Sequence, residues 1–333
     1  MATLAHHEAA RRTYQQEQPP MIGKPNLSAK FLGGMVGSAL GDAIGEMAFR
    51  MPGEAGLRAW IAETRGLVYT DDTAMAIGLA QSLAALGTLD QQDLGDTFQV
   101  NYLREPWRGY AQGPPALFRQ VSMTGTPYTE AARQLFRGQG SYGNGAAMRI
   151  APLGLFYYDA PDLYEQAERS ATVTHAHPIG VDGAAVLAWA IAQVVQIDPH
   201  QPFPTKRFVE GLEAFARTPE VRAKLRDVHD MLAHEVPARI AAPRLGQNVT
   251  AHGSVPFALY AFLRHPHDFE ECLFCAILNE GDRDTLGAMA CALSGAYLGV
   301  DAIPPEWRAR LENREEIEAL ALQLADLKRR QVI

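Results

Sequence analysis

Apolar side chains recur every three or four residues along most of the chain after position 26, which is the spacing of helices with one buried face. Ser28 is the expected N-cap of the first helix. The buried face of that helix would include Phe31, Met35, Leu40 and Ile44. The same spacing predicts helices over residues 72–85, 91–103, 146–157, 161–172, 180–196, 206–216, 255–263, 269–278, 285–298 and 315–328. Alternating strand patterns are nearly absent, so we expect an all-α, single-domain orthogonal helical bundle.

The first 25 residues lack this pattern and are polar and rich in glutamine. Such a composition cannot bury a core, so we expect residues 1–25 to form a flexible arm and residues 26–333 to form the all-α domain. Two interpretations of the arm stay open: a disordered tail, or a segment that docks onto a partner. The rest of the chain contains no repeat of fixed period and no clear linker.

Composition is that of an ordinary globular protein, with 47% hydrophobic residues, 20% charged residues and a formal net charge of −8. This charge disfavours a general phosphate-neutralising surface, so we expect no nucleic-acid partner. The longest apolar run, 183–195, is shorter than the roughly 20 residues that span a bilayer. The N-terminal residues also lack the apolar centre of a secretion signal. We therefore expect no membrane association and a cytoplasmic location.

The three cysteines make a poor disulfide framework for a chain of 333 residues, which suits a reducing compartment. Cys272 and Cys275 form a C-x-x-C pair, but no second pair or nearby histidine completes a zinc site. We interpret them as small buried residues on one face of a helix.

The stretch YTDDTAM, residues 69–75, places two carboxylates at the head of an apolar helix. One threonine or aspartate is enough to cap a helix, and acids suit the positive end of its dipole. Adjacent helical positions point about 100° apart, so Asp71 and Asp72 can reach two different ions. We favour a metal-binding role over a plain N-cap.

A second acidic stretch, NEGDRDTLGAM at residues 279–289, has Glu280, Asp282 and Asp284 at alternate positions before a small, apolar run. Carboxylates this close repel one another unless a cation lies between them. The stretch lacks the spaced oxygens and the later glutamate of an EF-hand loop. Two helix starts that each offer two carboxylates and a threonine match one shared, all-oxygen site, which favours Mg2+ or Mn2+ over zinc. Two divalent cations would offset the four carboxylates.

Three further stretches carry candidate chemistry. Residues 36–49, VGSALGDAIGEMAF, have small residues at helical spacing, which indicates close packing, and also carry Asp42 and Glu46 one turn apart. In GSYGNGAAMR, residues 140–149, the glycines allow a sharp turn and Asn144 with the following amides could hold an anion; a plain turn is the alternative. In THAHP, residues 174–178, His175 and His177 suit hydrogen bonding in a cleft or a structural role.

Taken together, GDAIG, YTDDTAM, GSYGNGAAMR, THAHP and GDRDTLGAMACALSGAYLG resemble the ADP-ribosylglycohydrolase family, in which they occur in this order. The resemblance extends over residues 27–307 and is greatest to the bacterial dinitrogenase reductase-activating glycohydrolase branch. It implies an all-α fold with a central dinuclear metal cleft. Two Mg2+ or Mn2+ ions in that cleft would hold the diol of the distal ribose and a reactive water.

The resemblance also implies roles for individual residues. The implied metal ligands are Thr70, Asp71, Asp72, Asp282, Asp284 and Thr285. The implied substrate contacts are Ser141, Tyr142, Gly143, Asn144, Gly145 and His175. The candidate catalytic acids are Asp284, Glu46 and Asp72. One position departs from the family, because Phe49 stands where many members have a glutamate; Glu46, nearly one helical turn earlier, is the acid closest to it.

From this resemblance we expect a metal-dependent hydrolase that removes ADP-ribose from modified protein side chains. The linkage implied by the branch is the N-glycosidic bond to arginine, and serine-linked or O-acetyl-ADP-ribose is the enzymatic alternative. A different class of function is an immunity or binding protein that blocks an ADP-ribosyltransferase toxin through the arm, with or without hydrolysis. The intact acids argue against a family member that has lost catalysis.

Overall fold

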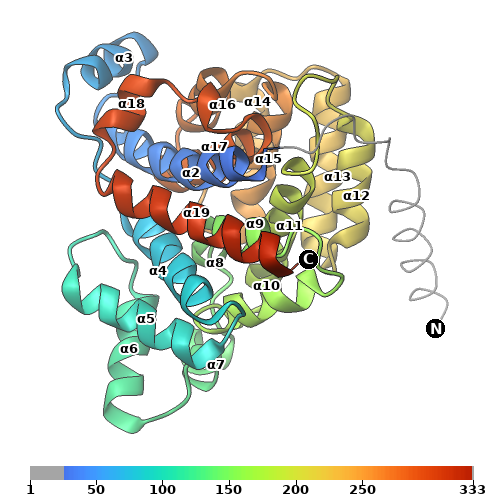
Figure 1. Ribbon diagram of the computed structural model, residues 1–333. Helices are drawn as coiled ribbons and strands as arrows, with labels where there is room; N and C mark the ends of the chain where they lie inside the picture. Colours follow the sequence, from blue (N-terminus) through green and yellow to red (C-terminus); the bar gives the residue numbers. More distant parts are fainter. Residues whose placement is uncertain (1–25, 332–333) are drawn as a thin grey trace.

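Helices α2 (Leu27–Arg50) and α17 (Arg283–Leu298) pack closely against each other in the computed structural model, which describes residues 26–331 (Figure 1). Their backbones nearly touch because glycines face each other. A Cβ atom on Gly41 would lie 2.1 Å from the carbonyl oxygen of Gly287, and one on Gly33 would lie 2.2 Å from that of Gly295. The prediction that small residues form a packing face in residues 36–49 is therefore confirmed. This contact sets the C-terminal half of α2 beside the start of α17.

The other elements are helical as well. Their bounds are α3 (Glu54–Glu63), α4 (Asp71–Leu86), α5 (Gln91–Arg104), α6 (Gly113–Thr124), α7 (Tyr128–Gly138), α8 (Gly145–Met148), α9 (Ala151–Phe156), α10 (Leu163–Thr172), α11 (Pro178–Val194), α12 (Thr205–Phe215), α13 (Pro219–Ala233), α14 (Ala238–Leu245), α15 (Val255–Arg264), α16 (Phe269–Ile277), α18 (Pro305–Arg310) and α19 (Arg314–Gln331), with short 3-10 helices η1 (Ala251–Gly253) and η2 (Val300–Ala302). No β-strand occurs between residues 26 and 331, and the predicted all-α class is confirmed.

Figure 1 shows how the helices surround this central pair. α19 lies along α2 and α4, while α5, α6 and α7 form a projection at the far end of α4. α12 and α13 cover the opposite side of the molecule. α11 is buried almost all round and packs against α8, α9, α10 and α17, so that it forms part of the interior.

Several predicted helix bounds are wrong for identifiable reasons. Asn26, not Ser28, caps α2, because its side chain accepts a 3.2 Å hydrogen bond from the amide of Ala29. The predicted helix 146–157 is two helices, α8 and α9. Pro152 has no N–H to continue the first helix and stands instead in the first turn of the second. Helices α3, α6, α7, α13, α14 and α18 were not predicted; α6, for example, buries only Pro114, Leu117 and Phe118.

No helix between residues 26 and 331 combines the length and hydrophobicity that crossing a bilayer requires. The predicted arm, residues 1–25, lies outside the described residues, and with it the hypothesis that the arm blocks a toxin.

Candidate functional site

Two helix starts bring four aspartates into one region. α4 begins at Asp71, with Thr70 as its N-cap residue, and α17 begins directly after Asp282. The region is compact enough that the charge of Asp284 acts on buried Asp72 from the other helix. Glu280, the remaining acid of the alternating series, is exposed and has a positive φ of 68° in the turn before α17. The predicted meeting of the two acidic stretches is thus seen in the fold.

Asp42 of α2 holds the start of α4 in place. This fully buried carboxylate accepts hydrogen bonds from the amide and hydroxyl of Thr70 at 3.0 and 2.8 Å, and from those of Thr73 at 3.0 and 2.6 Å. Asp42 therefore satisfies amides that a helix start leaves without partners. Its spacing to Glu46 is the only feature of Asp42 that the sequence pattern indicates. The signal that could have identified it is the pair of threonines that flank Asp71 and Asp72.

The acids have strongly perturbed proton affinities. Burial, followed by the charges of Asp42 and Asp282, raises the pKa of Asp71 to about 7. Burial and the charge of Asp282 raise the pKa of Asp284 to about 8. Burial and the charge of Asp284 hold the pKa of Asp72 well above its usual range. Burial is the largest cause of each shift, and the charges of neighbouring carboxylates add to it.

The donor set fits a hard divalent cation. The groups are carboxylate oxygens together with the hydroxyls of Thr70 and Thr285, which are the ligand type that Mg2+ and Mn2+ prefer. The Oδ2 atom of Asp72 is buried and has no hydrogen-bond partner among the described residues, as suits an atom whose partner is an ion. Between residues 26 and 331, however, no three histidine, cysteine, aspartate or glutamate side chains are placed as one metal-binding group. The dinuclear centre therefore stays a prediction.

The glycine-rich loop contacts one of these acids, Asp282. The side-chain amide of Asn144 donates a 2.7 Å hydrogen bond to Asp282, and its backbone amide donates to the carbonyl of Val249 at 2.9 Å. The amide of Gly143 donates to the hydroxyl of Ser141 at 3.1 Å. Helix α8, which follows the loop, has a single turn. The loop is thus fixed by its own polar contacts and by one acid.

Two histidines, His175 and His177, contact this loop. A Cβ atom on Gly145 would lie 2.8 Å from the ring of His175, so the loop and this buried histidine are in close contact. Burial, followed by the charge of Arg149, lowers the pKa of His175 to about 3, so the ring is neutral. Tyr142 is 44% exposed and meets the ring of His177 edge-on at 5.4 Å between centroids. His177 also caps α11 by accepting a 3.2 Å hydrogen bond from the amide of Ile179, which shows that its role is structural.

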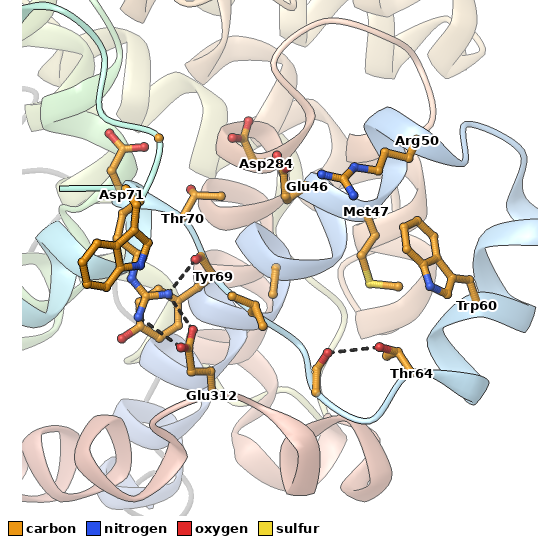
Figure 2. Close-up of a pocket in the computed structure, with 16 residues that line it drawn as sticks. Glu46, Met47, Arg50, Trp60, Thr64, Tyr69, Thr70, Asp71, Asp284 and Glu312 are labelled. Atoms are coloured by element: carbon orange, nitrogen blue, oxygen red, sulfur yellow. Dashed lines mark hydrogen bonds and ion pairs between the residues drawn. The ribbon is translucent and has the colours of Figure 1, made fainter. Parts of the chain in front are cut away.

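A cavity of about 590 Å³ opens beside the acids (Figure 2). Glu46, Thr70, Asp71 and Asp284 line it, whereas none of the loop residues 141–145 does. Phe49, at the position where the family often has glutamate, is 48% exposed and does not line the cavity. The expectation that Glu46 lies near the acids therefore agrees with the structure; its catalytic role stays a prediction.

Sequence reasoning missed the far walls of this cavity. Trp60 of α3 and Trp107 of the segment after α5 line it, together with Arg108. Arg108 is nearly buried, stacks over Tyr69, and donates to Glu312 at 2.6 Å from a position 204 residues away. No local sequence pattern predicts such contacts, because each partner comes from a different part of the chain.

Comparison with known proteins gives a consistent result. A family model described as ADP-ribosylglycohydrolase matches residues 23–332. The ADP-ribosylhydrolase ARH3 of Mus musculus is 33% identical over 340 residues, covering 89% of this chain and 91% of that protein. The ADP-ribosyl-(dinitrogen reductase) glycohydrolase of Rhodospirillum rubrum is 28% identical over 313 residues, covering 88% and 94%. A solved structure described as an ADP-ribosylglycohydrolase-related protein complex matches with a TM-score of 0.71 and 30% identity, covering 91% of this chain and 99% of that one.

Proposed function

Because the chain belongs to the ADP-ribosylglycohydrolase family, we propose that it is a metal-dependent hydrolase that removes ADP-ribose from modified protein side chains, and that the bond it cleaves is the N-glycosidic link to arginine. One observation carries the proposal. The acid-bearing starts of α4 and α17 meet at one place, and the hydrogen bond between Asn144 and Asp282 attaches the glycine-rich loop to them.

The proposed cation ligands come from both helix starts. They are Thr70, Asp71, Asp72, Asp282, Asp284 and Thr285, which would hold two Mg2+ or Mn2+ ions. Bound there, the ions would supply Lewis-acid polarisation of the ribose hydroxyls and a lower pKa for water. The orphaned, buried oxygen of Asp72 supports this assignment.

The chain's own residues would position the substrate and move protons. In the proposal, residues 141–145 hold ADP-ribose through backbone groups, the Asn144 amide and the exposed ring face of Tyr142, with His175 beneath them. Glu46 lies at the end of α2, in the cavity with Asp284, so it can pass a proton to the departing nitrogen. Asp284 and Asp72 complete the set of acids near an oxocarbenium-like transition state, whose positive charge carboxylates stabilise.

The proposal also specifies the bond that is cleaved and the cellular compartment. The names of the relatives leave the linkage open, and the carboxylates that line the cavity favour a cationic leaving group such as guanidinium. All three cysteines are free in the structure, which supports a reducing compartment and hence the cytoplasm.

The test is a comparison of three substrates with the purified full chain and Mg2+: an arginine-ADP-ribosylated peptide, a serine-ADP-ribosylated peptide and O-acetyl-ADP-ribose. Released ADP-ribose is measured by chromatography. We expect the arginine peptide to give the highest kcat/KM. Faster release from the serine-linked peptide or from O-acetyl-ADP-ribose would overturn the arginine linkage alone. If none of the three substrates released ADP-ribose, the proposed hydrolase activity would be overturned.

A further inference from the structure

The glycine-rich loop and the cavity contact different acids. Asn144 of the loop donates to Asp282, which does not line the cavity of about 590 Å³. This volume falls in the range of roughly 300–1,000 Å³ that is typical of ligand pockets. Asp71 and Asp284 line the cavity and the loop does not. If ADP-ribose binds against the loop, as the proposed function requires, the cavity is left for the group on the other side of the scissile bond.

Two indoles form part of the cavity wall. Figure 2 shows Trp60 and Met47 on one side, Asp71 and Tyr69 on the other, and Glu46 and Asp284 between them. Trp107 also lines the cavity and is 71% exposed. Neither indole stacks on another ring or on a cation within residues 26–331. Both indoles therefore line the cavity without a ring or cation partner among these residues.

The carboxylates that line the cavity differ in whether they already have a partner. Glu312 is already bound by Arg108, which also donates to Glu105 and to the carbonyl of Tyr69. Arg50, one helical turn after Glu46, also lines the cavity, and no ion pair joins the two side chains among residues 26–331. With Asp71 and Asp284 assigned to cations, Glu46 is the carboxylate that remains for a ligand. The described residues provide no ion pair or hydrogen bond for Glu46, which is half-buried.

From these observations we infer that the cavity is the subsite for the guanidinium leaving group, in which Trp60 and Trp107 hold the planar cation and Glu46 accepts its hydrogen bonds. Guanidinium is planar, weakly hydrated and always charged, so it stacks on indole faces and pairs with carboxylates. A serine hydroxyl has neither property. The subsite thus explains a preference for arginine linkages, and it rests on the proposed function for the placement of ADP-ribose.

The test uses agmatine, a guanidinium cation on a four-carbon chain, titrated calorimetrically into the full chain with Mg2+ and saturating ADP-ribose. Putrescine, which has an ammonium in place of the guanidinium, is the control ligand. We expect wild type to bind agmatine more tightly than putrescine. Trp60→Ala and Trp107→Ala should each weaken agmatine binding about fivefold to tenfold, the range of a partly desolvated cation–aromatic contact, while the Kd of ADP-ribose stays the same.

Met123→Ala is the matched surface control, because this α6 side chain is 78% exposed and does not line the cavity; its agmatine affinity should equal that of wild type. Unchanged agmatine binding in both tryptophan variants would overturn the subsite. Loss of ADP-ribose affinity in those variants would also overturn it, since the cavity would then hold the nucleotide. The two experiments can also disagree. If agmatine binding depends on the indoles but the protein cleaves only serine-linked substrates, the subsite is supported and the arginine linkage is overturned.

Discussion

The side-chain amide of Asn144 donates a 2.7 Å hydrogen bond to the carboxylate of Asp282, which lies 138 residues later in the chain. This contact joins the glycine-rich loop to the start of α17. The amide N–H group favours the ionised form of Asp282 and fixes its orientation, opposing the burial that raises its pKa. This hydrogen bond thus couples a residue proposed to bind the substrate to a residue proposed to bind the metal.

Replacing Asn144 with alanine should disturb both functions. Loss of the donor frees Asp282 to rotate, and groups that orient metal ligands typically contribute about 10–100-fold in metal affinity or activity. We expect Asn144→Ala to lower kcat/KM and the affinity for Mg2+ by about this factor, measured by steady-state kinetics and Mg2+ titration. Asn101→Ala, which removes a 2.9 Å hydrogen bond to Gln81 away from the acids, is the control and should retain both. Wild-type Mg2+ affinity in Asn144→Ala would show that the contact does not orient a ligand.

Asp42 and Asp182 form a matched pair of buried caps. Asp182 accepts hydrogen bonds from the amide and hydroxyl of Thr218 at 2.7 and 2.6 Å, at the start of α13. Asparagine offers one acceptor oxygen in place of two, so either Asp→Asn change should cost about 2 kcal/mol in the free energy of unfolding. Asp42→Asn should also lower kcat at least about tenfold, because Asp42 positions the helix that carries the acids, and residues that orient metal ligands act at this scale. Equal kcat values for the two variants, measured below their unfolding transitions, would contradict this role of Asp42.

The contact between α2 and α17 predicts an intolerance of added volume. At Gly41, a new Cβ atom would lie 2.1 Å from the carbonyl oxygen of Gly287. One of the two helices would have to move to make room for it. We expect Gly41→Ala to lower the free energy of unfolding by about 3 kcal/mol or more, or to prevent folding. Gly53 has nothing within 4 Å of the corresponding position, so Gly53→Ala should change stability by less than about 1 kcal/mol. Urea unfolding compares them, and equal midpoints would refute the close approach.

His175 predicts a pH dependence of stability. Burial, followed by the charge of Arg149, lowers its pKa to about 3, whereas an unfolded histidine titrates near about 6.5. Between these values the unfolded chain binds a proton that the folded protein does not. The contribution of His175 is therefore fully present above about pH 6.5 and is lost as the pH falls toward 3.

The measurement is urea unfolding of wild type and His175→Gln near neutral pH and at about pH 5. The wild type should lose about 2 kcal/mol more than the variant across this interval, at about 1.4 kcal/mol for each pH unit below 6.5. His234→Gln, at an exposed position at the end of α13, should lose as much as wild type. An identical pH slope in His175→Gln would mean that His175 titrates normally.

Local signals explain what the sequence predicted well. Residues 91–103 were predicted as a helix and α5 is Gln91–Arg104, because Asp90 caps it by accepting from the amide of Asp93 at 2.9 Å. α4 ends at Leu86, directly before Gly87, whose φ of 67° only glycine adopts freely. The acids at both helix starts were identified from a local signal too, because closely spaced carboxylates and a threonine precede an apolar helical run at each of them.

Contacts between distant segments explain what the sequence did not predict. Arg108 and Glu312, or Trp60 and Trp107, come together only through the packing of several helices. Asp42 shows the same limit at a single residue. Its spacing to Glu46 was visible in the sequence, but its partners, Thr70 and Thr73, lie about thirty residues away on another helix.

The central claim is that the acids at the starts of α4 and α17 support a divalent cation that is required for release of ADP-ribose. The direct measurement is turnover of an arginine-ADP-ribosylated peptide by the purified chain with Mg2+, with Mn2+ and with a chelator, for wild type, Asp71→Ala and Asp284→Ala. We predict that wild type turns over with either metal, that chelator abolishes turnover, and that both variants are inactive while remaining folded by circular dichroism. Turnover at the wild-type rate in either folded variant, or in wild type with chelator, would contradict the claim.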